Sequence, residues 1–398
     1  MQGSDWFLHN NSKDGLFIES STVIVDHLHL SDNGQSGSHI FDSRYVTLSN
    51  LTAIGNGNLG LNEMEQAGLF FEKSNDLESS SGDVTCNHCM VSNSAGSGVM
   101  VKDSVDLFLN HLTVENNNPA YDPITVDNSG LSLGQQGGRF HMHDVLIITE
   151  RQGTDAGPAV RINRAAGNID TLVLQGNHSG MVWNANNNGN YPSELSRAQL
   201  SGTSCLLLID HSDLIGQDNT IVPECTGSII LQNSQVNWSS FTDLTASTAI
   251  NLDSFSKLHL HQPQQIDFAS AIIAPSAEID IAWDIEVWVQ NNNSNGIPSA
   301  PVGISFDQFE PNAQENANDI GYVKFPNFIG QQWTQSGASR LTTVTIDCAY
   351  DGLTNSSSVS LDDDKTVYCI LPIDNQPPFL YWDSPEGDSI YPLSLIHI

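Results

Sequence analysis

The sequence contains few basic residues: Lys and Arg together number 13, against 46 Asp and Glu, and the formal net charge is -33 at pH 7. Nucleic-acid phosphates bind clustered Lys and Arg, and anionic membrane surfaces attract the same side chains. The composition therefore argues against a nucleic-acid partner and against binding to anionic membranes. A surplus of acids fits a secreted protein in salty water or beside divalent cations, although charge that simply keeps the chain soluble is the simpler interpretation.

Long apolar runs are also missing. No stretch approaches the ~18 apolar residues that a spanning helix requires, so no membrane span is predicted. No signal peptide is recognisable at residues 1–6, yet Trp6-Phe-Leu-His9 already has the pattern of the middle of a repeat. Leu393-Ser-Leu-Ile-His-Ile398 resembles translated adaptor sequence. We therefore expect an internal fragment of a longer protein, whose upstream part is unknown.

Cysteines are few and occur in three near pairs: Cys86 and Cys89, Cys205 and Cys225, and Cys348 and Cys369. In an acidic, Asn- and Ser-rich chain this spacing predicts disulfides, and hence an extracellular or cell-surface location. The first pair has the form Cys-x-x-Cys, for which half a zinc site or a redox motif is the alternative. A local disulfide is favoured because the sequence contains no second Cys-x-x-Cys and no strand–helix context around it.

A loose repeat of short alternating strands and Asn/Gly turns runs from about Ser20 to Ala277. Examples of the strands are residues 22–30, 45–51 and 98–102, and examples of the turns are residues 55–58 and 93–98. Each unit holds about three strands, and a single unit cannot bury its apolar face, so stacked coils are required. Gly and Asn at the corners supply left-handed backbone angles, and we expect corner Asn side chains to form ladders between coils.

This pattern resembles the right-handed parallel β-helix family, the fold of pectate lyases, polygalacturonases and many surface repeat proteins. The resemblance covers residues 5–277 and implies an all-β solenoid over residues 1–277. Residues 191–224 break the rhythm and are expected to hold a longer excursion. Cys205 and Cys225 lie about one coil apart, where a bridge would join neighbouring coils.

From Glu278 the pattern changes to longer strands separated by turns, which predicts a small β-sandwich over residues 278–373. The segment Gly296-Ile-Pro-Ser-Ala-Pro-Val302 and the later Asp319-Ile-Gly321 turn resemble immunoglobulin-like surface domains. That resemblance implies a spacer or adhesion module, with Cys348 and Cys369 bridged between strands. Residues 374–398 are interpreted as a linker and the truncated start of a further domain.

Acidic residues near the middle of the solenoid are the candidates for catalysis: Asp103, Asp106, Asp127 and Asp144. β-Helix hydrolases use acids on adjacent coils as general acid and base, and the related lyases use a basic residue with calcium. The motif set of the polygalacturonases is absent, apart from a partial match at Arg161-Ile-Asn163. Because the chain has 46 acids, some clustering is expected without any function.

Three His-x-His pairs, at residues 27 and 29, 141 and 143, and 259 and 261, place two imidazoles on one face of a strand. Such pairs chelate zinc or copper when a neighbouring coil adds ligands, and His141-Met-His143-Asp144 is the richest candidate. The alternative is that Leu points inward and His points outward as an ordinary exposed residue. Calcium at bends such as Asp32-Asn-Gly34 is a further open alternative, although no repeat-specific calcium motif is present.

The leading hypothesis is a non-catalytic secreted or cell-surface structural or adhesion protein, whose β-helix is a stalk or a glycan-contacting surface. Trp183, Tyr191 and Trp238 are candidates for stacking on sugars, with packing inside the solenoid as the alternative. A polysaccharide lyase or glycoside hydrolase acting on the β-helix face, with catalytic coils within residues 80–165, is the second hypothesis. A viral fibre, which would form obligate trimers, is the third.

Overall fold

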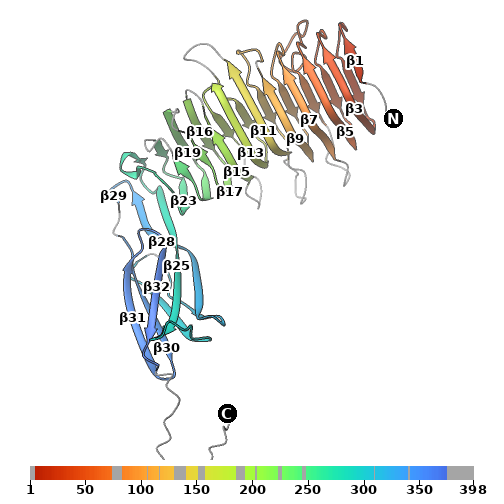
Figure 1. The fold of residues 1–398 in the computed structure, drawn as a ribbon. Helices are drawn as coiled ribbons and strands as arrows, with labels where there is room; N and C mark the ends of the chain where they lie inside the picture. The colour runs from red at the N-terminus through yellow and green to blue at the C-terminus, as the bar shows by residue number, and fades with distance from the viewer. Residues whose placement is uncertain are drawn as a thin grey trace, which may run out of the picture.

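The computed structural model is all-β and consists of a long solenoid followed by a smaller two-sheet unit (Figure 1). It describes residues 5–73, 83–104, 106–115, 117–129, 140–150, 157–184, 193–201, 204–222, 226–243, 248–308, 310–338 and 341–373. In this part of the chain, none of the helices is long and apolar enough to cross a membrane.

The solenoid is built from two parallel sheets, and each coil contributes to both. The first sheet, sheet A, contains β1 (Trp6–His9), β3 (Val23–Ser31), β5 (Val46–Ile54), β7 (Val84–Ser92), β9 (Leu107–Glu115), β11 (Phe140–Glu150), β13 (Gly167–Asn177), β15 (Ser193–Leu200), β17 (Asp213–Gln217), β18 (Thr220–Ile221), β20 (Gln235–Ser239), β21 (Thr242–Asp243) and β23 (Lys257–His261). Sheet B contains β2 (Leu16–Glu19), β4 (Ser38–Phe41), β6 (Leu69–Glu72), β8 (Val99–Lys102), β10 (Ile124–Asp127), β12 (Val160–Asn163), β14 (Met181–Asn184), β16 (Ser204–Asp210), β19 (Thr226–Gln232), β22 (Ala249–Leu252) and β24 (Ile272–Ile273). A short 3-10 helix, η1 (Phe268–Ser270), precedes β24.

The long strands of sheet A bend once, at a residue with positive φ. In β5 this residue is Asn50, with φ of 52°, and both Leu48 before it and Leu51 after it are buried. The bend lets both halves of the strand face the same core. The equivalent positions in β3, β7 and β9 are His27, His88 and His111. Asn and His are among the side chains that tolerate this backbone region, which explains their recurrence at the corner.

The core is one continuous cluster of stacked apolar side chains along the solenoid. Leu28, Leu30, Leu258 and Leu260 are all buried, which confirms the prediction that Leu alternates inward between the outer His-x-His residues. Trp183 and Trp238 are also fully buried, so packing inside the solenoid is confirmed for both and sugar stacking is not. Tyr191 lies outside the described residues.

Corner side chains form hydrogen-bonded ladders between coils, as predicted for Asn. The buried Asn33 donates from its backbone N and from Nδ2 to Asn56 Oδ1, at 3.1 and 2.9 Å, and Asn11 N donates to Asn33 Oδ1 at 3.2 Å. At another corner the backbone N of Ser212 donates to Ser234 Oγ at 3.1 Å. These bonds satisfy buried polar groups at bends, where strand pairing is interrupted.

The second unit contains β25 (Glu278–Asn291), β26 (Pro301–Phe306), β27 (Ala313–Asn316), β28 (Tyr322–Thr334), β29 (Gly337–Ala338), β30 (Thr343–Tyr350), β31 (Leu353–Ser360) and β32 (Lys365–Leu371). The first half of β25 pairs in parallel with β23 of the solenoid, and its second half pairs in parallel with β32. Strand β28 runs antiparallel along β25. Strands β27, β26, β30 and β31 form a separate sheet, and the two sheets share one core. The immunoglobulin-like assignment and the boundary at residue 278 remain predictions, but β25 is common to both units.

Two of the three predicted disulfides are present. Cys86 and Cys89 are bridged within β7, with their Cα atoms 6.1 Å apart. Cys348 in β30 and Cys369 in β32 join the two sheets of the second unit, with a Cα separation of 6.4 Å. Cys205 lies in β16, but Cys225 lies outside the described residues.

Candidate functional site

The acids predicted to be catalytic are divided between the two sheets. Asp103 and Asp127 lie at the ends of sheet B strands, where Asp103 Oδ1 accepts from Asn128 Nδ2 and Asp127 lies 3.3 Å from Arg164 Nη2. Asp144 instead occupies the bend of β11 in sheet A and accepts from His111 Nδ1 at 2.6 Å. Asp106 immediately precedes β9, also in sheet A. The structure therefore brings Asp103 and Asp127 to one corner, with Asp106 later in the same turn between β8 and β9, and places Asp144 elsewhere.

Sheet B carries a row of alternating charges that the sequence analysis did not identify. His39 Nε2 lies 3.6 Å from Glu72, and Glu72 lies 3.7 Å from Lys102 Nζ. Lys102 is in register with Glu72 on one side and with Asp127 on the other. The enzymatic alternative requires acidic and basic side chains on neighbouring coils, and Lys102 between two carboxylates is such an arrangement. It was missed because its members come from separate coils and share no motif.

Each predicted metal ligand contacts another side chain, and His143 also approaches the ring of His111 with a centroid separation of 6.0 Å. His141 stacks on Phe108 with ring centroids 4.5 Å apart, and His143 Nδ1 donates to Asp170 Oδ2 at 3.1 Å. Asp144, as noted, accepts from His111. No group of three or more His, Cys, Asp or Glu side chains is placed to hold a metal ion among the residues that the structure describes.

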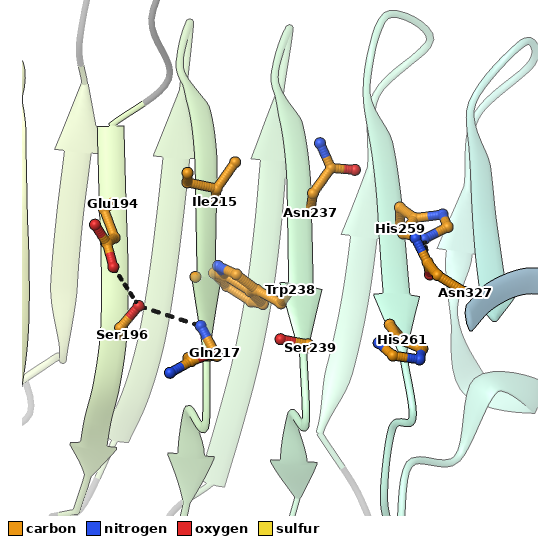
Figure 2. A pocket seen from close by; sticks show the side chains of 11 residues that line it. Glu194, Ser196, Ile215, Gln217, Asn237, Trp238, Ser239, His259, His261 and Asn327 are labelled. Carbon is orange, nitrogen blue, oxygen red and sulfur yellow. Dashed lines mark hydrogen bonds between the residues drawn. The ribbon is translucent and has the colours of Figure 1, made fainter. Parts of the chain in front are cut away.

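A shallow groove of about 420 Å³ crosses the outer face of sheet A in the last coils (Figure 2). It extends over β15, β17, β20 and β23, and its far end is contributed by β28. Eight of its eleven lining residues are of polar type; the lining consists of Glu194, Ser196, Ile215, Gly216, Gln217, Asn237, Trp238, Ser239, His259, His261 and Asn327. Ile215 supplies an apolar patch that is 40% exposed. Consecutive coils thus present side chains in two rows, one of Ile215, Asn237 and His259 and one of Gln217, Ser239 and His261.

Several groove side chains are held by one another. Ser196 Oγ donates to Glu194 Oε1 at 3.0 Å and accepts from the backbone N of Gln217 at 3.2 Å (Figure 2). At the far end, His259 Nε2 donates to Asn327 Oδ1 at 2.9 Å. The first bond lies within β15 and the other two cross to another strand, so the side chains of Glu194, Ser196, His259 and Asn327 are held before any ligand arrives. A preorganised polar surface loses less conformational entropy on binding.

Gly216 allows β17 to lie close to the backbone of β15 beside the groove. A Cβ at this position would lie 1.8 Å from the carbonyl oxygen of Leu195 and would force the strands apart. Gly216 is also in register with Trp238, which borders the groove although its indole packs in the solenoid core. A glycine inside a strand often marks a close approach of backbone or ligand, and it was the available sequence signal for this site.

A buried carboxylate, Asp284, anchors the end of the groove to the second unit. Asp284 Oδ1 accepts from His261 Nε2 at 2.7 Å and from the backbone N of Asn327 at 2.9 Å, while Lys324 Nζ lies 2.6 Å from Oδ2. The backbone N of Asp284 donates to Asp364 Oδ1 at 2.8 Å. The side chain is only 5% exposed.

The electrostatics of Asp284 follow from these contacts. Burial alone would raise the pKa of Asp284, but the hydrogen bonds from Lys324, Asn327 and His261 outweigh it, so the pKa lies below its usual value. The same hydrogen bond to Asp284 raises the pKa of Lys324. Both groups are therefore charged at neutral pH. The network ties His261, a groove residue, to two residues of β28.

Comparison with known proteins supports the solenoid. Residues 7–145 match the family model described as "Right handed beta helix region". No curated protein and no solved structure matches the chain. The matched segment covers the first coils of both sheets, and the parallel pairing continues through β23. The match and the stacked parallel strands together confirm the predicted solenoid, and the chain is a parallel β-helix repeat protein over these coils.

Proposed function

We propose that this chain is a non-catalytic secreted or cell-surface protein whose β-helix binds a neutral glycan along the groove of sheet A. The observation that carries the proposal is the register of outward polar side chains on neighbouring coils: Gln217 of β17 lies beside Ser239 of β20, and Asn237 of β20 extends this polar surface. Parallel strands repeat at ~4.8 Å, close to the length of one pyranose residue in an extended glycan. Successive coils therefore offer hydrogen bonds to successive sugars.

The charge of the chain favours a neutral ligand over an acidic one. A net charge of -33 repels polyanions, and the groove itself contains the Glu194 carboxylate. Amide and hydroxyl side chains such as Gln217 and Ser239 both donate and accept, as sugar hydroxyls do. The two histidines at the far end are already engaged with Asn327 and Asp284.

The location outside the cell rests on the cysteines and the charge. Disulfides persist in oxidising compartments, and the structure forms two of them. The second unit, which continues directly from the solenoid through β25, suits a spacer that holds the groove away from a surface. Adhesion through the groove is the role that follows from this arrangement.

Binding to hexasaccharides tests this proposal. Cellohexaose, xylohexaose and mannohexaose would be titrated calorimetrically against the chain, with hexagalacturonate as the acidic comparison. At least one neutral ligand should bind, and the double variant Gln217→Ala/Asn237→Ala should weaken groove binding about tenfold, as for loss of central contacts. Asn251→Ala removes a matched amide from sheet B and should change nothing. Wild-type affinity in the double variant would contradict the proposal.

The charge row on sheet B favours one second candidate, a polysaccharide lyase or hydrolase. Lys102 between Glu72 and Asp127 is the specific observation, and calcium is the ion that such a lyase would use. The same glycans would be incubated with and without calcium while reducing ends and unsaturated products are followed. We expect no turnover. Turnover that disappears in Lys102→Ala or Asp127→Asn would replace the binding proposal with an enzyme.

A further inference from the structure

The second unit carries three aromatic side chains in one row across adjacent strands. Trp288 of β25 is in register with Tyr322 of β28 on one side and with Tyr368 of β32 on the other. Their strand neighbours Val287 and Val367 belong to the buried core of this unit. Because side chains alternate along a strand, the three rings project on the face opposite that core.

The rings form an exposed apolar surface. Tyr368 is 58% exposed, and Ile370, which follows on the same face of β32, is 48% exposed. Trp288 and Tyr322 are partly buried against each other, with ring centroids 4.9 Å apart. Packing against Tyr322 holds the indole of Trp288 in place. Apolar side chains that are contiguous at the surface, unlike singly scattered ones, mark a contact surface.

The charged groups beside the row are already paired within the chain. Glu286 accepts from the Tyr322 hydroxyl at 3.2 Å, and Lys324 is paired with Asp284 at 2.6 Å. The row therefore presents ring faces bordered by satisfied polar groups, with the Gln290 amide beside Ile370 in register. This charge pattern suits an uncharged ligand that has both an apolar face and hydroxyl groups. A pyranose ring has both, since its axial C–H bonds form an apolar face.

The row is also continuous with the groove. Asp284, on the same strand as Trp288, contacts His261 at the end of the groove and Lys324 near Tyr322. Strand β28 contributes Asn327 to the groove and Tyr322 to the row. One sheet thus carries both surfaces across the junction of the two units.

We infer that Trp288, Tyr322 and Tyr368 form a binding site for the ring face of a neutral pyranose in a glycan chain. Aromatic side chains supply large, rigid contact area, and their ring faces attract the slightly positive C–H groups of the sugar. The site extends glycan contact to the second unit, and it does not depend on the groove for its geometry. A glycan longer than the groove would contact both surfaces.

The experiment uses the whole chain and cellohexaose, xylohexaose and mannohexaose, with calorimetric affinity and stoichiometry as the readout. It is done in the Gln217→Ala/Asn237→Ala background, which removes groove contacts and isolates the row. We expect binding to persist there and to weaken about tenfold in Trp288→Ala and Tyr368→Ala, as for loss of an aromatic anchor. Tyr368→Phe keeps the ring and should bind normally. Tyr350→Ala, an exposed tyrosine on β30, is the matched control.

Three outcomes would overturn the inference. One is that none of the three hexasaccharides binds in this background. Another is that binding is unchanged in Tyr368→Ala, a test that holds even if Trp288→Ala fails to fold, because Tyr368 is largely exposed. The third is a dimer in sedimentation that dissociates in Tyr368→Ala, which would assign the row to a second copy of the chain. Failure of groove binding alone leaves the row binding measurable, so the two proposals are separable.

Discussion

Replacement of Asp284 should loosen the junction between the solenoid and the second unit. Its carboxylate accepts from His261 and from the Asn327 amide and pairs with Lys324, and the side chain is 5% exposed. A hydrogen bond to a charged group contributes about 1.5–3 kcal/mol, and losing one member of a buried ion pair costs about 3–5 kcal/mol. Lys324 is 44% exposed and is hydrated again once its partner is removed. We therefore expect Asp284→Ala to lower the free energy of unfolding by about 3 kcal/mol, the lower end of that range.

The assay is urea unfolding at pH 7, with Asp347→Ala, an exposed acid on β30, as the matched control. The control should stay within about 0.5 kcal/mol of the wild type. Asp284→Asn keeps one acceptor but loses the charge, so it should fall between Asp284→Ala and the wild type. A free energy of unfolding for Asp284→Ala that equals the control would refute the reasoning, because the buried network would then contribute nothing.

The stability contributed by Asp284 should also depend on pH, in a direction that its shifted pKa determines. The pKa of Asp284 is lower in the folded chain than its ordinary value of 3.8. Its contribution is therefore fully present above pH 3.8 and is lost as the pH falls through the folded pKa. The difference in stability between the wild type and Asp284→Asn should be constant near neutral pH and should narrow below pH 3.8. A difference that widens on acidification would contradict the assigned pKa direction.

Two further predictions concern stability. Asn56→Ala should cost about 2 kcal/mol in urea unfolding, because Asn56 Oδ1 accepts two hydrogen bonds from the buried ladder; an unchanged midpoint would show that the ladder is not stabilising. Removing the Cys348–Cys369 bridge, which spans 21 residues, should lower the free energy of unfolding by about 2–4 kcal/mol. Removing the Cys86–Cys89 bridge, which spans 3 residues, should lower it by less, because a shorter loop constrains the unfolded chain less. Paired Ser variants compared in the same assay decide this, and the reverse order would contradict the argument.

Much of the fold could be predicted from local pattern. Alternation around His27 and His29 correctly placed Leu28 and Leu30 in the core, because neighbouring side chains on a strand point to opposite faces. The Asn corners followed from the backbone angles that tight bends require, although His27, His88 and His111 occupy equivalent bends without being foreseen. Near pairs of cysteines indicated the two disulfides that the structure forms.

The candidate sites could not be predicted in the same way. The groove unites Ser196, Gln217 and Asn237 with Asn327 of β28, and the aromatic row unites residues of three strands far apart in the sequence. Their proximity depends on the lengths of intervening loops and on strand register, which no local pattern encodes.

The sequence by itself determined the stacked coils, because each short strand must bury one face and no single coil has enough partners to do so. Only the tertiary structure decided which outward residues of successive coils meet, and that β25 continues from the solenoid into the second unit. The physical reason is that burial acts on every coil alike, whereas a binding surface arises only from the register that pairing imposes between coils.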